Sequence, residues 1–529
     1  MKKVSRYEPS DHPHESVKVF ADYQGDIVDR CDVVVVGSGP GGAVVAKELA
    51  EAGFDIVLLE EGLAWDAPDF VPDAGAAMVR MLREGGMRAT RGNVFMPTMQ
   101  AIALGGGSVV NSAICARSPA WVFDRWASLH GTELLTGASL DGHYQRVESF
   151  LGVEPTLEKV LGERNLAFKR GCDALGMSSA PCPRNAPGCK GSAECFTGCR
   201  NRGKASMDVS YVPAAIRAGA RVYTSVRVDT VMASGRRARG VQGKAVDPRS
   251  KKAVYDVRVQ ARVVVLSAGC MATPVILQRS EIGNENGQAG RHLRFHPGTA
   301  VLAVFPDLIR PWEGATQGYH SLHELEDGLK YEVLWSPPPI IATRFPGMGV
   351  QFKDQLARFE RSAPFDAYVD GADSEGSVTG RPFGLEPDIR FTFGAKDVKK
   401  LHRGLCRLVE ISLAAGAVEV LPGLFGYKPV LRSQADLDEL RAYRMKPTDP
   451  VIAGTHAFGS TRMGNNVKTS VVDVDGRCHQ TDNLYIADSG VIPSSPAVNP
   501  MLTIMALASR TAHILAARIN LFFLGVRRC

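Results

Sequence analysis

The hydrophobic pattern near the N-terminus predicts a strand, a helix and a second strand. Residues 32–37 (DVVVVG) are a β-branched run that is apolar on both faces, which is typical of a buried parallel strand. Residues 39–53 (GPGGAVVAKELAEAG) favour a helix that stops at its last glycine, and residues 55–60 (DIVLLE) form a second apolar run. A unit of about thirty residues with this order indicates an α/β fold of the doubly wound, Rossmann-like kind.

Two later apolar runs have the same buried character. Residues 263–266 (VVVL) and 483–487 (NLYIA) each lead into a turn with glycine and then into a helical pattern, which is clearest over 501–519. Residues 300–440 differ, because proline, aromatic residues and irregular stretches are more frequent there. We therefore expect a second, α+β domain inserted into a dinucleotide-binding domain that is assembled from discontinuous segments.

The turn between the first strand and the first helix carries a phosphate-binding pattern. Gly37, Gly39 and Gly42 fit G-x-G-x-x-G. The first glycine permits a tight turn, the second lets the backbone approach a pyrophosphate, and the third allows the helix to pack closely on the strand. Glu60 ends the second strand, where a carboxylate accepts hydrogen bonds from both ribose hydroxyls. These features predict a bound dinucleotide.

Several separated blocks resemble the glucose–methanol–choline (GMC) oxidoreductase family, and the resemblance spans residues from about 30 to 515. It implies FAD as the cofactor and the oxidation of an alcohol to an aldehyde or ketone. The chain departs from the family at 101–102 (Ala-Ile in place of Gly-Arg) and at 280–281 (Ser-Glu in place of Ser-Gly). The blocks are LGGGSVVN at 104–111, SAGCMATPVIL at 267–277, GRHLRFHP at 290–297, HAFGSTRMG at 456–464, NLYIADSGVIP at 483–493 and VNPMLTIMAL at 498–507.

The resemblance also implies which residues bind FAD. It places a glycine-rich loop against the flavin, the backbone of Val228 at the adenine, and Asp488 with Gly490 near the ribityl–pyrophosphate region. The remaining implied FAD-binding residues are Gly106, Ser108, Asn111 and Met501.

Alcohol oxidation by hydride transfer to flavin N5 needs a group that takes the hydroxyl proton. His456 is the candidate base, because a neutral imidazole accepts a proton near neutral pH and the resemblance places it over the flavin. Asn499 is the second catalytic candidate, since its amide can donate to the substrate oxygen. Asn499 before Pro500 is also typical of a helix start, and the two roles are compatible. His296 lies in a family turn and is expected to be structural.

We expect the chain to divide into four stretches. We expect an N-terminal arm at 1–30, the first part of the FAD-binding domain at 31–299, a substrate-binding domain at 300–440, and the C-terminal part of the FAD-binding domain, with the catalytic residues, at 441–529. The first part contains a cysteine-rich excursion at about 150–205.

Four cysteines, Cys182, Cys189, Cys195 and Cys199, fall within this excursion. A structural zinc site or an iron–sulfur centre needs three or four thiolates brought together. The segment has no C-x-x-C pair, and C-x-x-x-C is a weak metal signature. Plain thiols, a disulfide and a metal site therefore all stay open.

Composition and charge add few constraints on partners. The chain has 529 residues with a net charge of +6 and no long basic run, which gives no indication of nucleic-acid binding. The N-terminus lacks the apolar core of a signal peptide, and the apolar tail at 514–526 is too short and interrupted to span a bilayer. We expect a cytoplasmic protein with no transmembrane segment, and contact of the tail with a membrane surface is left open.

The substrate is expected to be a hydrophobic, long-chain or sterol-like alcohol. Residues 331–349 (YEVLWSPPPIIATRFPGMG) and 413–423 (LAAGAVEVLPG) resemble the long-chain alcohol oxidase and sterol oxidase branches. A polar primary alcohol such as an amino sugar, a different reaction on the same flavin scaffold, and a catalytically silent binding protein are the alternatives. The electron acceptor is O₂ or another oxidant.

Overall fold

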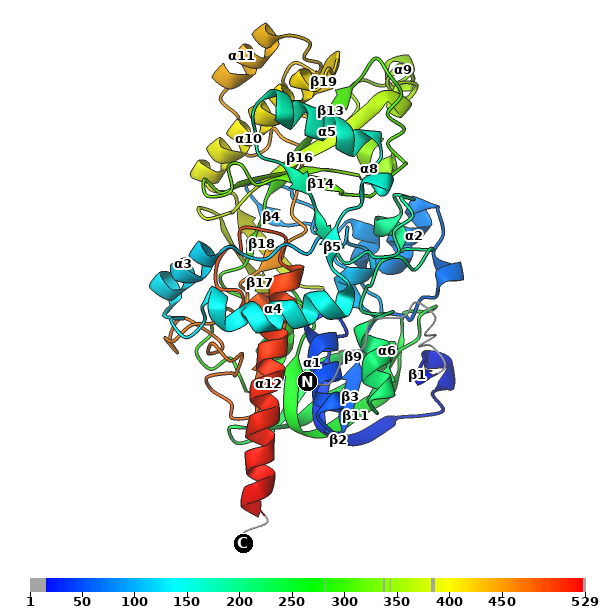
Figure 1. The fold of residues 1–529 in the computed structure, drawn as a ribbon. Coiled ribbons are helices and arrows are strands. Elements are labelled where there is room, and N and C mark those ends of the chain that lie inside the picture. Colours follow the sequence, from blue (N-terminus) through cyan, green and yellow to red (C-terminus); the bar gives the residue numbers. More distant parts are fainter. Residues whose placement is uncertain (1–15, 281, 336–337, 343, 382–385, 527–529) are drawn as a thin grey trace.

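The β-branched run at residues 32–37 lies at the centre of an eight-stranded sheet, in the lower part of Figure 1. β2 (Ile27–Val36) pairs in parallel with β3 (Ile56–Leu59) on one side and with β11 (Ala253–Leu266) on the other. Residues 33–36 are buried on both faces, as expected for a central parallel strand. The computed structural model describes residues 16–280, 282–335, 338–342, 344–381 and 386–526.

The other strands of this sheet form a parallel part and an antiparallel extension. The order is β1-β8-β3-β2-β11-β10-β9, and β22 pairs with the C-terminal half of β11. The strands are β1 (Val17–Lys18), β8 (Arg221–Tyr223) and β22 (Leu484–Ile486), all parallel to their neighbours, and β9 (Val226–Ser234) and β10 (Arg237–Val246), both antiparallel.

The predicted strand–helix–strand unit is confirmed by β2, α1 (Pro40–Glu51) and β3, and the Rossmann-like α/β class with it. The two later apolar runs are confirmed as the end of β11 and as β22, and the helical pattern lies in α12 (Met501–Val526). The N-terminal segment differs from the expected irregular arm, because β1 and residues 27–30 are strands of the sheet. Residues 1–15 lie outside the described residues.

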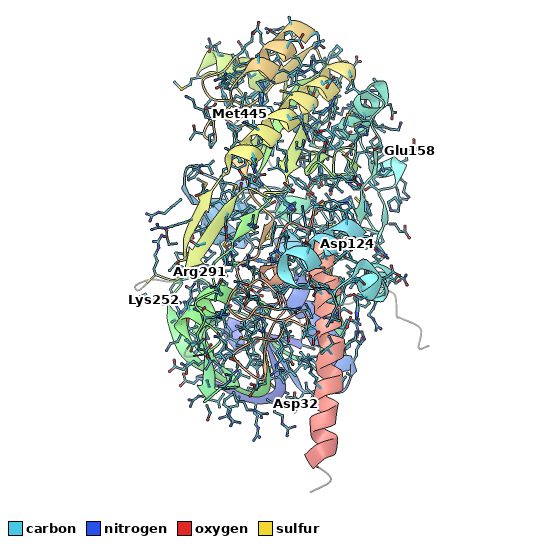
Figure 2. All side chains as sticks on the ribbon, turned by 90° about the vertical axis from the view of Figure 1, so that its left-hand side faces the viewer. Asp32, Asp124, Glu158, Lys252, Arg291 and Met445 are labelled. Atoms are coloured by element: carbon cyan, nitrogen blue, oxygen red, sulfur yellow. The ribbon has the colours of Figure 1, made fainter. Side chains whose placement is uncertain are left out.

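A layer of helices covers this sheet. α1 packs against α12 and against α6 (Tyr211–Arg217), and α12 also packs against α4 (Gly137–Leu151). Figure 1 and the perpendicular view in Figure 2 show α12 running along the lower part of the molecule and extending past it. Among the described residues, no helix combines the length and the apolar character that crossing a membrane requires.

A second, seven-stranded sheet lies in the upper part of Figure 1 and is built around β13 (Gly298–Val304), β16 (Ser362–Val369) and β15 (Leu329–Val333). The residues of one face, such as Val301, Tyr331 and Phe365, enter a core with α10 (Ala395–Ala414) and α5 (Glu163–Ala174). The opposite face is left for the site described below. The remaining strands are β14 (Tyr319–Ser321), β6 (Ala180–Pro181), β19 (Glu419–Leu421) and β20 (Ile452–Ala453).

Short elements connect the two large sheets. β12 (Arg294–Phe295) pairs with β21 (Ala457–Phe458), and this pairing places two distant segments beside each other. The other short strands and helices lie outside the two large sheets. They are β4 (Arg91–Gly92), β5 (Glu154–Pro155), β7 (Pro183–Arg184), β17 (Glu375–Thr379), β18 (Asp388–Thr392), α2 (Ala74–Met81), α3 (Ala120–His130), α7 (Thr273–Arg279), α8 (Pro338–Ala342), α9 (Val350–Leu356) and α11 (Gln434–Ala442).

Candidate active site

The glycine turn has the geometry that phosphate binding requires. Gly37 adopts a φ of +96°, and a Cβ there would meet the carbonyl oxygen of Ser267 at 2.3 Å. A Cβ on Gly42 would meet the carbonyl oxygen of Gly37 at 2.0 Å, so this glycine lets α1 pack closely on β2. A Cβ on Gly39 would approach no heavy atom more closely than the Cα of Gly106 at 4.0 Å. The middle glycine therefore faces open space, where a pyrophosphate can approach the backbone.

Glu60 organises the turn as well as facing the cleft. Its Oε2 accepts hydrogen bonds from the backbone N–H of Ser38 at 2.9 Å and from the Ser38 hydroxyl at 2.6 Å, and its Oε1 accepts from the Gly62 N–H at 2.8 Å. The backbone N–H of Gly105 donates to the same Ser38 hydroxyl at 2.9 Å, which ties the second glycine-rich loop to the turn. Burial raises the pKa of Glu60, and its bonds to Ser38 oppose that rise.

A cleft of about 330 Å³ runs along the carboxyl ends of the parallel strands. Glu60 and Val228 line one region of it, and Gly39, Gly106 and Asp488 line others. Ligands of open α/β sheets bind at this edge. A carboxylate for a ribose, an open glycine for a pyrophosphate and one cleft that both residues line together fit FAD.

Asp488 fixes the floor of this cleft. Its Oδ2 accepts from the Gly269 N–H at 2.9 Å and from the Thr273 hydroxyl at 2.6 Å, and its Oδ1 accepts from the Gly490 N–H at 2.8 Å. Gly490 itself is packed inside the protein, where a Cβ would meet the hydroxyl of Thr461 at 2.3 Å. Gly490 therefore holds the turn in place, while Asp488 is the one of the two that lines the cleft.

The loop at 104–111 places its side chains in two directions. The Asn111 amide donates to the Met501 sulfur at 3.0 Å, and both residues line the cavity next to the cleft. The Ser108 hydroxyl donates to the Gly105 carbonyl at 2.6 Å and accepts from the Met207 N–H at 2.9 Å. Ser108 thus braces the loop from inside the protein.

A second cavity of about 380 Å³ adjoins the cleft, because Pro40, Gly107 and Ser489 line both. His456 and Asn499 lie in its wall, and the Nδ2 of Asn499 is 3.4 Å from the Nε2 of His456. The two catalytic candidates, which are far apart in the sequence, therefore meet at the end of a slot that begins at the glycine turn.

His296 belongs to the same cavity, although the sequence suggested only a structural role. The pairing of β12 with β21 brings it beside His456, and the two Nδ1 atoms are 3.2 Å apart. The Nε2 of His296 lies 2.8 Å from the Ser495 hydroxyl. The pairing of two distant strands created this contact, and the local pattern around His296 gave no signal for it.

A buried lysine determines which way the Asn499 amide faces. Lys330 donates to the Oδ1 of Asn499 and to the Oε1 of Glu332, and both residues of this ion pair are almost fully buried. The Tyr368 hydroxyl donates to the same Oδ1 at 3.4 Å. An ammonium group can only donate, so the Asn499 oxygen faces Lys330 and the NH₂ group faces His456.

This orientation assigns the protons of both histidines. The Nε2 of His456 accepts from Asn499, so its Nδ1 carries the proton and donates to the Nδ1 of His296. The Nε2–H of His296 then donates to the Ser495 hydroxyl. The one lone pair of His456 is therefore on Nε2, the atom that faces Asn499 in the cavity wall, and a substrate hydroxyl that donates to it would take the place of the amide.

The electrostatics keep His456 neutral. Burial lowers its pKa to about 4, the carboxylate of Glu332 opposes this shift, and the nearby ammonium of Lys330 adds to it. Burial likewise lowers the pKa of His296 well below its usual value, and the neighbouring His456 contributes. Both imidazoles are therefore uncharged at neutral pH, each with a single N–H proton.

Four residues near the catalytic candidates escaped the sequence reasoning. Glu332, Asp366 and Tyr368 line the cavity, and Lys330, which does not line it, contacts Asn499. Three of them could have been noticed as charged residues inside strand-like apolar runs, in LKYEV at 329–333 and in SAPFDAYV at 362–369. A buried charge in such a run needs a partner or a function.

The clustered cysteines are free thiols, and no group of described residues is arranged to hold a metal ion. Cys189, Cys195 and Cys199 line one small pocket with Arg184 and Lys204. The fourth member of the cluster, Cys182, is buried between β6 and β7.

The surroundings of Cys195 are cationic. Its burial raises the thiol pKa, but Arg184 and Lys204 outweigh burial and the net shift is downward. Lys204 Nζ also donates to the carbonyls of Val109 at 2.7 Å and Asn111 at 2.8 Å. The cysteine-rich segment therefore supports the loop that the family places against the flavin.

A glycine turn at the start of a Rossmann-like sheet, a nucleotide-sized cleft and an adjoining cavity with a neutral histidine define a dinucleotide-dependent oxidoreductase. Comparison with known proteins specifies it further. The family described as GMC oxidoreductase matches residues 78–298 and 372–508, and a FAD binding domain matches residues 30–89. The chain belongs to the GMC oxidoreductase family, binds FAD and is an oxidoreductase acting on CH–OH groups.

Individual relatives agree with this assignment. An uncharacterized GMC-type oxidoreductase of Mycobacterium tuberculosis is 33% identical over 97% of this chain and 80% of its own length. The long-chain-alcohol oxidase FAO4B of Arabidopsis thaliana is 28% identical over 93% of this chain and 67% of its own length. Among solved structures, pyridoxine 4-oxidase from Mesorbium loti superposes with a TM-score of 0.70 at 18% identity, over 91% of this chain and 98% of that one, which shows a shared fold.

Proposed function

We propose that this protein oxidises a hydrophobic alcohol to an aldehyde or ketone, with His456 as the base and Asn499 as a donor to the substrate oxygen. The observation that carries the proposal is the 3.4 Å approach of the Asn499 amide to the neutral His456 imidazole in the wall of one cavity. The cavity is lined largely by apolar side chains, among them Met78, Leu82 and Ile341, which favours a hydrophobic substrate.

The proposed roles follow from the donors and acceptors. Bound FAD would supply the hydride acceptor. His456 takes the hydroxyl proton at Nε2, and Asn499 holds the substrate oxygen through its Nδ2. The carboxylate of Glu332 favours the protonated form of His456, so it stabilises the charge that arises when the proton arrives.

The implied FAD contacts are part of the proposal. Gly37, Gly39 and Glu60 would bind the pyrophosphate and ribose, and Val228 would meet the adenine. The other proposed contributors to the FAD site are Gly42, Gly106, Ser108, Asn111, Asp488, Gly490 and Met501, of which Gly42, Ser108 and Gly490 act by shaping the loops.

Anaerobic mixing of the FAD-loaded protein with primary alkanols of increasing chain length tests the proposal. We expect flavin bleaching whose efficiency rises with chain length, and a loss of about 10²–10⁴-fold in the reduction rate for His456→Ala at unchanged FAD content. The matched control is His323→Ala, an exposed histidine. A full rate in His456→Ala would refute its role as the base. Hydrogen peroxide formation in air identifies O₂ as the acceptor.

A polar primary alcohol, such as an amino sugar, is the second candidate substrate. Two carboxylates, Glu332 and Asp366, line the cavity and favour it. The alkanol series distinguishes the two candidates. A hydrophobic substrate predicts that the efficiency of flavin bleaching rises with chain length, and a polar substrate predicts no such rise.

A further inference from the structure

One face of the second sheet forms a wall of the substrate cavity, and its side chains lie in rows. The register of β15 with β16 places Lys330 opposite Tyr368 and Glu332 opposite Asp366. Same-face neighbours along a strand are about 6–7 Å apart. Lys330 and Tyr368 contact Asn499, and the row of Glu332 and Asp366 lies one such step along the strands beyond the row that makes these contacts.

The wall becomes apolar beyond this acidic row. Pro364 lies two residues before Asp366 on β16, and the backbone N–H of Leu334 donates to the carbonyl of Pro364 at 3.0 Å. Both residues line the cavity, together with Ile341 and Phe196. The cavity wall is therefore graded: the catalytic row, then a carboxylate row, then an apolar region.

The two carboxylates differ in what they bind. Glu332 is saturated within the protein, because its Oε1 accepts from Lys330 and its Oε2 accepts from the Gln317 amide at 2.8 Å. Asp366 lines the cavity, and its Oδ1 is buried without a hydrogen-bond partner among the residues that the structure describes. Burial raises the pKa of Asp366 well above its usual value, with repulsion from Glu332 next, and the cations Lys330 and Arg344 oppose the rise.

Arg344 does not saturate Asp366. Its guanidinium donates to the carbonyls of Ala300 at 2.8 Å and Val451 at 3.4 Å, and it acts on Asp366 through its charge. A substrate that is only hydrocarbon beyond its alcohol would displace water from Asp366 and leave that carboxyl buried without a partner, which costs free energy.

We propose that the substrate carries a second hydrogen-bond donor, a hydroxyl or an ammonium group, about 6–7 Å from the carbinol carbon, and that Asp366 accepts it. The apolar region beyond holds the rest of the substrate. The substrate class is thus an amphiphilic diol or amino alcohol. This inference rests on the proposed function, since it assumes that the carbinol binds at His456 and Asn499.

Three alcohols of equal chain length test the inference on the FAD-loaded enzyme. They are a primary alkanol, the same chain with a hydroxyl on its fifth carbon, and the same chain with an amine there, because an extended chain places that group at about the required separation. We measure anaerobic flavin reduction at several concentrations of each. The expected result is a preference of about tenfold or more, in rate over dissociation constant, for at least one substituted chain.

Two substitutions then assign the preference to one residue. In Asp366→Leu the preference over the plain alkanol should fall to about one. Asp366→Asn retains an acceptor oxygen but cannot ionise. It should keep a preference for the hydroxyl and lose one for the amine, whose ammonium form would favour the ionised carboxyl of Asp366. FAD content and thermal unfolding are recorded for each variant, and Asp354→Asn, an exposed acid on α9, is the matched control.

The possible failures are distinct. Equal reduction by all three alcohols in the wild-type enzyme, or a preference that persists in Asp366→Leu, overturns this inference and leaves the proposed function standing. If no alcohol reduces the flavin, the proposed function and this inference both fall.

Discussion

Lys330 donates a hydrogen bond to the side-chain oxygen of Asn499, and this bond sets the direction of the amide. The orientation passes from Asn499 to His456 and then to His296, because each partner can only fill the remaining donor or acceptor role. One buried cation, remote in sequence from both catalytic candidates, therefore determines which nitrogen of the proposed base is free to accept a proton.

Removing this cation should slow flavin reduction without removing FAD. Lys330→Met alone leaves Glu332 buried and unpaired, which costs on the order of 3–5 kcal/mol of stability. The double variant Lys330→Met/Glu332→Gln removes both charges, and we expect it to fold, to bind FAD and to lose about 10²-fold in reduction rate because the amide is no longer held. Stopped-flow mixing with an alkanol measures this rate.

Comparing the reduction rates of combined variants separates a positioning role of Lys330 from a general structural effect. If Lys330 acts through the amide, Asn499→Ala should lower the rate by a similar factor. The triple variant Lys330→Met/Glu332→Gln/Asn499→Ala should then be no slower than Glu332→Gln/Asn499→Ala, in which only Lys330 differs. Additive losses would show that Lys330 acts by another route.

The depressed pKa of His456 gives a definite pH dependence. The neutral imidazole is the reactive form, and burial lowers its pKa to about 4, so the base is available throughout neutral and mildly acidic conditions. The rate of flavin reduction should stay constant from about pH 8 to pH 5 and fall below that, with an inflection near pH 4 in place of one near 6.5. An inflection near 6.5 would mean that His456 is solvated or is not the base.

Stability must be followed in the same experiment. The folded state binds fewer protons than the unfolded chain wherever a histidine pKa is lowered by burial, as for His296 and His456. The contribution of these two histidines to the free energy of unfolding is fully present above about pH 6.5. It declines as the pH falls towards their pKa values in the folded state. The bound-flavin absorbance at each pH tells whether a lower rate reflects protonation of the base or unfolding.

The sequence predicted those parts of the molecule that local patterns encode. The turn at 37–42 is local, since three glycines and two apolar runs within one segment require that geometry, and β2, α1 and β3 appear where expected. The loop at 104–111 was also found, but the direction of each side chain was not, and Ser108 turned out to brace the loop from inside.

Contacts between distant strands were beyond the sequence. His296 and His456 meet because β12 pairs with β21. Lys330 and Tyr368, which both contact Asn499, lie opposite each other because β15 pairs with β16 in one register. Shifting either register by one residue would turn these side chains to the opposite face, and no local pattern fixes that choice. The acidic row at Glu332 and Asp366 could therefore be identified only from the folded chain.

Alanine substitutions at two nearby glycines, Gly39 and Gly41, should separate an effect on FAD binding from an effect on folding. A Cβ at Gly39 would meet no atom closer than the Cα of Gly106 at 4.0 Å, and its φ of −64° suits alanine, so Gly39→Ala should change stability by no more than about 0.5 kcal/mol. The added methyl group occupies the space for the pyrophosphate, and FAD affinity should fall strongly. A Cβ at Gly41 would lie 1.6 Å from the carbonyl oxygen of Ala487, so Gly41→Ala should prevent correct folding.

Circular dichroism and FAD fluorescence distinguish these outcomes. Gly39→Ala should melt like the FAD-free wild type and retain no flavin after gel filtration. A variant that keeps its flavin would place the pyrophosphate elsewhere in the cleft. Gly53→Ala, where a Cβ also meets no atom but φ is +89°, is the control for backbone strain alone and should retain FAD.

Lys204 connects the cysteine-rich segment with the loop that the family places against the flavin, and its removal should loosen FAD. Its Nζ donates to the carbonyls of Val109, Asn111 and Cys195, and its side chain is 2% exposed. Lys204→Met retains the length of the side chain but leaves these carbonyls without their donor, which should cost about 1–3 kcal/mol in unfolding free energy. Because two of the carbonyls belong to the loop, FAD should dissociate faster as well.

Lys190→Met provides the matched control, since Lys190 lies in the same segment and is exposed. Urea unfolding measures the stability change, and repeated ultrafiltration measures FAD release. Faster release in Lys204→Met with normal release in Lys190→Met would show that the cysteine-rich segment supports the cofactor through this one ammonium group. Normal FAD release in both variants would mean that the loop holds its shape without Lys204. The segment's contribution would then have to come from the packing of Arg184 and the thiols.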